Sequence, residues 1–203
     1  MRTRILAVLG AVALCTPALA YIEALKSLAG LYKETDVIAR GVIDAVSVEK
    51  KVMIVKVGKP LKGKTAYERI KINLGAADGW HGDVAVKHAV VGAPVALFYH
   101  KAEGSEKAGM GMIYLNRFFL IVAPDDEMWR LVRIELTMNK VFAGTADELQ
   151  TLTGKVLSGR VKPPAANDDW KPYTKDILEA LPLSPKDGEK WPEFDAAGAF
   201  KAQ

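Results

Sequence analysis

Positive charge is concentrated between residues 50 and 71 of the chain. This stretch contains eight basic residues and one acidic residue, Glu68, whereas the whole 203-residue chain has a formal net charge of +4. Clustered positive charge raises the local concentration of anions and speeds their association. We therefore expect an anionic ligand to contact Lys56, Lys59, Lys62, Arg69 and Lys71.

Two other interpretations of the basic stretch stay open. The charges are only solvated, as charge runs commonly are, or they pair with acids of the C-terminal region such as Asp168 and Glu193. A nucleic-acid partner has little support, because such proteins interleave aromatic and basic residues and only Tyr67 lies in this stretch. The expected partner is an anionic polysaccharide, an envelope surface or an acidic protein.

A Gly-rich segment, residues 78–83, contains the one group that resembles a metal site, formed by His81, Asp83 and the nearby His88. Imidazole and carboxylate groups bind zinc and similar ions. However, two histidines seven residues apart match no ligand template, so we predict a polar loop, no metal and no cofactor. A metal-dependent hydrolase is the least supported alternative.

The sequence contains neither G-x-S-x-G nor H-E-x-x-H, and no phosphate-binding glycine loop. His100 follows an apolar run and is expected to be a structural residue at the end of a strand. We therefore predict a binding protein rather than an enzyme.

Residues 1–20 have the pattern of a signal peptide. Arg2 and Arg4 precede an almost wholly apolar run, and Ala18 and Ala20 occupy the small-residue positions of a cleavage site. The apolar run is shorter than the roughly 20 residues that a transmembrane helix needs, although an uncleaved anchor is the alternative. Cleavage after Ala20 would remove Cys15, the only cysteine. We expect an exported protein, periplasmic or secreted, that is stabilised by a core without disulfides.

Most of the remaining chain is typical of an antiparallel sheet. Residues 69–74 alternate cleanly, with Ile70 and Ile72 on one face and Arg69 and Lys71 on the other. A turn is expected at residues 58–63, and a loop at 75–91. Six strands are predicted, at residues 36–46, 52–57, 69–74, 95–100, 112–122 and 128–136.

Helical periodicity flanks this sheet region. Residues 21–35 have a short apolar stripe, and residues 138–160 contain a helix with a capping box at Thr145 and Glu148 and a glycine, Gly159, at its end. Residues 161–203 form a Pro-rich tail with a short helix expected near 175–181. Trp170 and Trp191 in this tail either pack back on the barrel or dock a partner, as in an assembly protein.

Three short motifs resemble the secreted OB-fold barrels of the netrin-module, tissue-inhibitor type. They are Asp-Val-Ile-Ala-Arg-Gly-Val at 36–42, Val-Gly-Lys-Pro-Leu-Lys-Gly at 57–63 and Val-Gly-Ala-Pro-Val at 91–95. The family's inhibitory cysteines are absent after signal cleavage, so metalloprotease inhibition is not implied. The resemblance implies an α+β fold with a mostly antiparallel, OB-like β-barrel of five to six strands over residues 36–137, flanked by the two helices.

Overall fold

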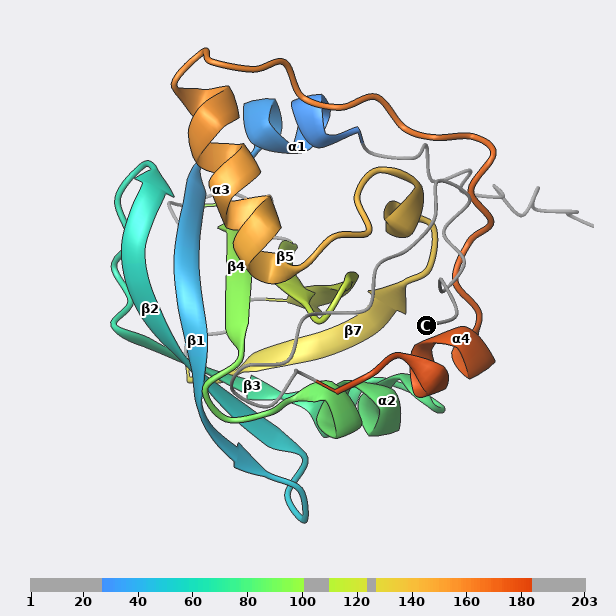
Figure 1. The fold of residues 1–203 in the computed structure, drawn as a ribbon. Helices are drawn as coiled ribbons and strands as arrows, with labels where there is room; N and C mark the ends of the chain where they lie inside the picture. Colours follow the sequence, from blue (N-terminus) through green and yellow to red (C-terminus); the bar gives the residue numbers. More distant parts are fainter. Residues whose placement is uncertain (1–26, 101–109, 124–126, 184–203) are drawn as a thin grey trace, which may run out of the picture.

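The computed structural model describes residues 27–100, 110–123 and 127–183. These residues form a closed β-barrel with short helices packed around it (Figure 1). The α+β class and the barrel predicted from the sequence are therefore confirmed. The strands are β1 (Val37–Ser47), β2 (Val52–Lys62), β3 (Arg69–Asn73), β4 (Pro94–Tyr99), β5 (Gly111–Leu115), β6 (Phe118–Ala123) and β7 (Trp129–Glu135).

The barrel has seven strands in the order β1-β2-β3-β7-β6-β5-β4, and pairing of β4 with β1 closes it. The prediction of five to six strands was too low because the apolar run 112–122 folds into two strands. Asn116 and Arg117 connect them with φ angles of 39° and 74°. Positive φ at both central residues is the geometry of a two-residue hairpin turn, which asparagine tolerates well.

One strand pair is parallel. Ile72 of β3 lies opposite Trp129 of β7 in a parallel register, whereas every other neighbouring pair in the described barrel is antiparallel. The barrel is therefore mixed. The parallel pair joins strands that are far apart in the sequence, and closure of the barrel requires it together with the β1–β4 pair.

Strand β2 continues through the turn that was expected at residues 58–63. Pro60 lies opposite Ala39 of β1, while pairing of β2 with β3 ends at Lys56 and Arg69. On the edge of β2 that faces β3, strand pairing has already ended before Pro60. The missing N–H of Pro60 therefore breaks no hydrogen bond between β2 and β3. The chain turns at Gly63 instead, with φ 70°.

Two apolar cores lie on opposite sides of the barrel wall. The interior core contains inward residues such as Met53, Val55 and Ile72, all fully buried. The second core lies outside the wall, where α1 (Leu28–Glu34) and α3 (Ala146–Leu157) pack on β4, β5 and β6. This covering explains why β4 is buried on both faces.

The long C-terminal helix begins as its sequence indicates. Thr145 and Glu148 form both hydrogen bonds of the capping box of α3, and Gly159 follows the helix with φ 73°. Residues 138–145, expected within this helical segment, instead contain the short 3-10 helix η2 (Met138–Lys140) and a connection.

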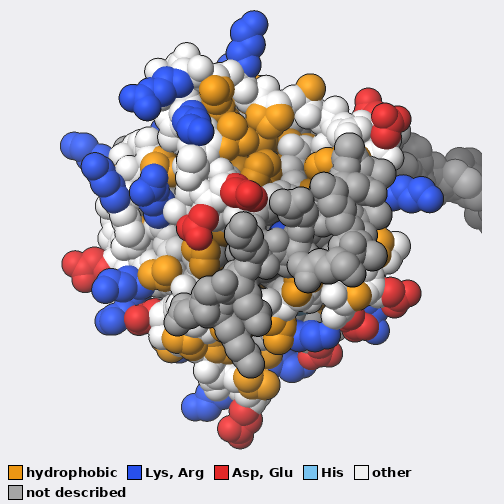
Figure 2. All heavy atoms as spheres, viewed as in Figure 1, with side chains coloured by type: hydrophobic (Ala, Val, Ile, Leu, Met, Phe, Trp, Pro, Cys, Tyr) orange, Lys and Arg blue, Asp and Glu red, His pale blue; other side chains and the backbone are white. Residues whose placement is uncertain are grey.

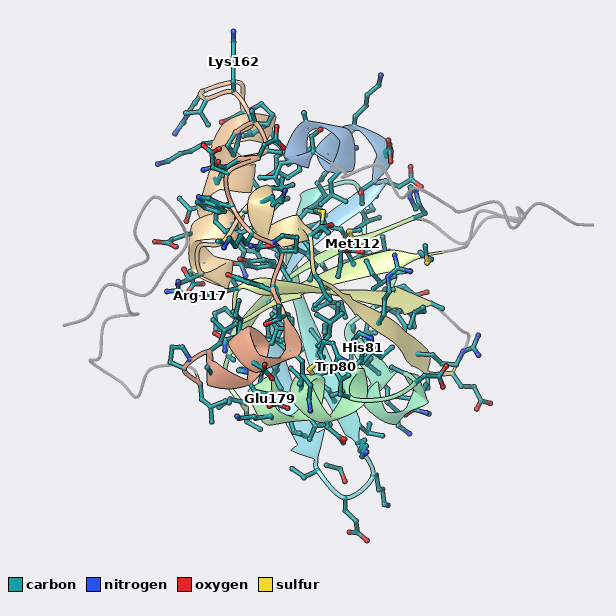
Figure 3. The ribbon with its side chains drawn as sticks, turned by 90° about the vertical axis from the view of Figure 1, so that its right-hand side faces the viewer. Trp80, His81, Met112, Arg117, Lys162 and Glu179 are labelled. Atoms are coloured by element: carbon teal, nitrogen blue, oxygen red, sulfur yellow. The ribbon has the colours of Figure 1, made fainter. Side chains whose placement is uncertain are left out.

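The predicted loop at 75–91 contains two helices, η1 (Leu74–Ala76) and α2 (His81–His88). Helix α4 (Lys175–Ala180) lies beside α2, as Figure 3 shows near Glu179. The glycines of residues 75–82 hid α2 from the sequence pattern. The closely packed Gly82 is one of them, since an added Cβ would lie 2.5 Å from the Leu74 carbonyl oxygen.

Candidate functional site

The register of β2 and β3 brings three of the predicted ligand-binding residues together. Lys56 lies directly opposite Arg69, and Lys71 is opposite Ile54, two positions along the same strands. Val55, Ile70 and Ile72 between them are buried in the barrel interior, so alternation directs the three cations outward.

Like charges face each other across this strand pair. Directly opposed like charges destabilise a sheet, so the sheet does not gain from the Lys56–Arg69 pair. Asp44 of β1 reduces the repulsion, because the Arg69 Nε lies 2.9 Å from its Oδ2. The Arg69 side chain is 65% exposed, and such exposed ion pairs contribute about 0–1 kcal/mol. The face therefore keeps an excess of positive charge.

Arg40 extends this surface onto β1, although sequence reasoning did not select it. Arg40 is exposed and lies across from Gly58 of β2. A Cβ atom added to Gly58 would lie 3.7 Å from the Arg40 Cβ. Arg40 precedes the basic stretch in the sequence by ten residues, and only the alternation of β1 could have indicated it. Four cations of this region form no salt bridge with any described residue: Arg40, Lys56, Lys59 and Lys71.

We call Arg40, Lys56, Lys59, Arg69 and Lys71 the basic face. Figure 2 shows Lys and Arg side chains along the left margin of the molecule, where β2 lies in Figure 1. Two other lysines of the run have different contacts. Lys51 Nζ pairs with Asp83 Oδ1 at 2.7 Å, and Lys62 donates to backbone carbonyl oxygens at the end of α1, including that of Tyr32 at 2.7 Å. We therefore leave Lys62 out of the face.

The residues that resembled a metal site do not converge. The His81 ring lies beside that of Trp80 (Figure 3), with ring centroids 4.1 Å apart and planes tilted by 32°. Its Nδ1 accepts a hydrogen bond from the Ile134 N–H. Burial lowers the pKa of His81, and the positive charge of Arg133 lowers it further. Asp83 pairs with Lys51 at the surface. In the described ranges, no three His, Cys, Asp or Glu side chains are placed to share a metal ion.

His88 is instead buried between the barrel and the C-terminal segment. Its Nε2 donates to the carbonyl oxygen of Leu178 at 2.8 Å, and its Nδ1 accepts from Asn116 Nδ2 at 2.7 Å. Asn116 Nδ2 also donates to the carbonyl oxygen of Pro182 at 2.8 Å. Burial lowers the pKa of His88. This network attaches the segment after α4 to the β5–β6 turn.

The described part of the tail packs on the barrel. Tyr173, Leu178 and Leu181 are buried in the interior core cluster, and the Tyr173 N–H donates to the Leu136 carbonyl oxygen at 2.8 Å. Trp170 is half-buried, and Trp191 lies outside the described residues. Partner docking through these two tryptophans stays a prediction.

None of the helices in the described ranges is long and apolar enough to cross a lipid bilayer. In comparisons with protein-family models, with curated proteins and with solved structures, no match to this chain was found.

Proposed function

We propose that this chain is an exported, non-enzymatic binding protein whose basic face takes a partner with repeated negative charges. One observation carries the proposal. The fold collects cations from β1, β2 and β3 on one outward surface, with Asp44 bonded to Arg69 among them. We also propose that the barrel is OB-like, since its first three strands form a meander and β1 closes on β4. In OB-folds, the face of strands 2 and 3 binds oligonucleotides and oligosaccharides.

The spacing of the cations favours a polymer over a single small anion. Directly paired residues such as Lys56 and Arg69 are roughly 5 Å apart, and residues two apart on one strand, such as Arg69 and Lys71, are roughly 7 Å apart. The surface therefore presents positive charges at repeated intervals. An acidic polysaccharide has charges at repeated intervals too, so several ion pairs form at once.

The field of such a face extends about 8–10 Å at moderate ionic strength. It would accelerate encounter with a polyanion, and the complex would weaken steeply with salt. Binding that is insensitive to salt would have a different cause.

The test is retention of the protein on a dextran sulfate column under a salt gradient. The Lys56→Glu, Arg69→Glu, Lys71→Glu triple variant is compared with a matched triple variant, Lys155→Glu, Arg160→Glu, Lys162→Glu. The control residues are exposed and lie on α3 or just after it, as Figure 3 shows for Lys162. Both variants change the net charge equally, so only the position of the charges differs.

We expect the basic-face variant to lose retention and the control variant to elute near the wild type. Circular dichroism and thermal melting check that both remain folded. Equal elution of the two variants would show that retention follows net charge alone, and the proposal would be wrong.

A further inference from the structure

A small pocket lies at the end of α1, where β4 ends and β5 begins. His100 and the two methionines Met110 and Met112 line it, with apolar walls that include Phe98 and Ile121. Figure 3 shows Met112 on the side of the barrel that α1 covers. None of these residues belongs to the basic face.

The size of the pocket limits what it can hold. Its volume is about 30 Å³, whereas one water needs about 10–15 Å³ and organic ligands occupy about 300–1,000 Å³. The pocket therefore has room for a single ion or one or two waters, and it is too small for an organic cofactor.

Three of the side chains that line the pocket, those of His100, Met110 and Met112, are donors that bind soft metal ions. Met110 and Met112 are separated by Gly111, and alternation in an extended strand places both side chains on the same face. Thioether sulfur binds Cu(I), and imidazole also binds copper ions, whereas hard cations such as Mg²⁺ prefer oxygen. A packing role alone would explain the methionines, but not their presence beside a partly exposed imidazole.

The imidazole of His100 lies beside a carboxylate. Its Nδ1 lies 3.4 Å from Asp36 Oδ2, which leaves Nε2 as the nitrogen available to the pocket. Histidines that bind metals characteristically direct their other nitrogen to a carboxylate, which fixes the tautomer. Glu34 and Thr35 also line the pocket, and the Lys62 ammonium donates to the Thr35 carbonyl oxygen.

We infer that this pocket binds one Cu(I) ion through His100 Nε2 and the sulfur atoms of Met110 and Met112. Two neutral thioethers and one neutral imidazole suit a monovalent soft ion. A dipositive ion such as Zn²⁺ prefers thiolate, imidazole or carboxylate ligands, and beside its two thioethers the pocket lining offers one imidazole and the Glu34 carboxylate. The inference is independent of the basic face.

The test is competition for Cu(I) between the protein and bicinchoninate, under nitrogen with ascorbate. Every protein carries Cys15→Ser, because that thiol would bind Cu(I) by itself. The test variants are Met112→Leu, the Met110→Leu, Met112→Leu double variant and His100→Gln. The control is Met128→Leu, a half-buried methionine outside the pocket. Leucine conserves the volume of methionine, so the folds should tolerate the changes.

The wild type and Met128→Leu should bind one equivalent of Cu(I) with the same affinity. Met112→Leu and His100→Gln should each weaken binding at least tenfold, and the double methionine variant should abolish stoichiometric binding. Zn(II), titrated in parallel, should bind the wild type and the methionine variants equally weakly, because thioethers are poor ligands for zinc. Wild-type affinity in the double variant, or no competition by the wild type, would overturn the inference.

Discussion

Protonation of His88 should loosen the packing of the C-terminal segment on the barrel. Its side chain is 1% exposed, and its Nδ1 accepts a hydrogen bond from Asn116 Nδ2 at 2.7 Å while Nε2 donates to the Leu178 carbonyl oxygen. A proton on Nδ1 would turn this acceptor into a donor that faces an amide N–H. Rotating the Asn116 amide would not help, because its oxygen would then face the Pro182 carbonyl oxygen.

The direction of the pH effect follows from the pKa. Burial lowers the pKa of His88, the hydrogen bond to Leu178 acts in the opposite direction, and the charge of Lys87 lowers it further. The unfolded state, with a pKa near ~6.5, therefore binds the proton more readily. The contribution of His88 to stability is complete above about pH 6.5 and decreases as the pH falls toward the folded-state pKa. The slope is at most about 1.4 kcal/mol per pH unit.

The assay is urea unfolding of the wild type and of His88→Gln between pH 8 and pH 4.5. Glutamine does not titrate, and the carboxylates and His81 are common to both proteins, so the difference in unfolding free energy isolates His88. Loss of one buried hydrogen bond sets the scale of the effect at about 1–3 kcal/mol. A difference that stays constant from pH 8 to pH 4.5 would refute the reasoning.

Further predictions concern four single substitutions. Tyr173→Phe removes a buried hydroxyl that has no hydrogen-bond partner within the described residues, so the free energy of unfolding in urea should stay equal or rise. Tyr114→Phe removes a 2.6 Å hydrogen bond to the Gly144 carbonyl oxygen and should lower the free energy of unfolding by about 1 kcal/mol. Burial raises the pKa of Tyr173 to about 12. The wild type should therefore lose stability between about pH 10 and 12 relative to Tyr173→Phe. Melting temperatures that fall equally in both proteins over this pH range would contradict the prediction. Thr145→Ala should lower the free energy of unfolding by about 1 kcal/mol through loss of the capping box. Gly82→Ala should lower it by about 1–3 kcal/mol, because the added Cβ would lie 2.5 Å from the Leu74 carbonyl oxygen.

Elements with local signals were predictable from the sequence. The alternation of Ile70 and Ile72 with Arg69 and Lys71 defines both faces of β3, and the capping box defines the start of α3. These features depend on residues close in the chain, so periodicity and side-chain chemistry are sufficient to find them.

Features that depend on long-range pairing were not predictable. The parallel pairing of Ile72 with Trp129 has no sequence signal, although the closed barrel requires it. Arg40 joins the basic face only because β1 lies beside β2, and Lys62 leaves it because α1 supplies carbonyl acceptors nearby. Asn116 within the apolar run was a local signal for a turn, and it could have indicated the seventh strand.

The most direct test of the basic face is the salt dependence of its affinity for a fluorescent dextran sulfate, measured by anisotropy between 25 and 300 mM NaCl. The Lys56→Gln, Lys71→Gln variant is compared with Lys155→Gln, Lys162→Gln and with the wild type. Each cation that contacts the polymer contributes about one to the slope of log K against log salt concentration, by analogy with nucleic acid. The account predicts a slope reduced by about two in the first variant and unchanged in the second. The same slope in all three proteins would contradict it.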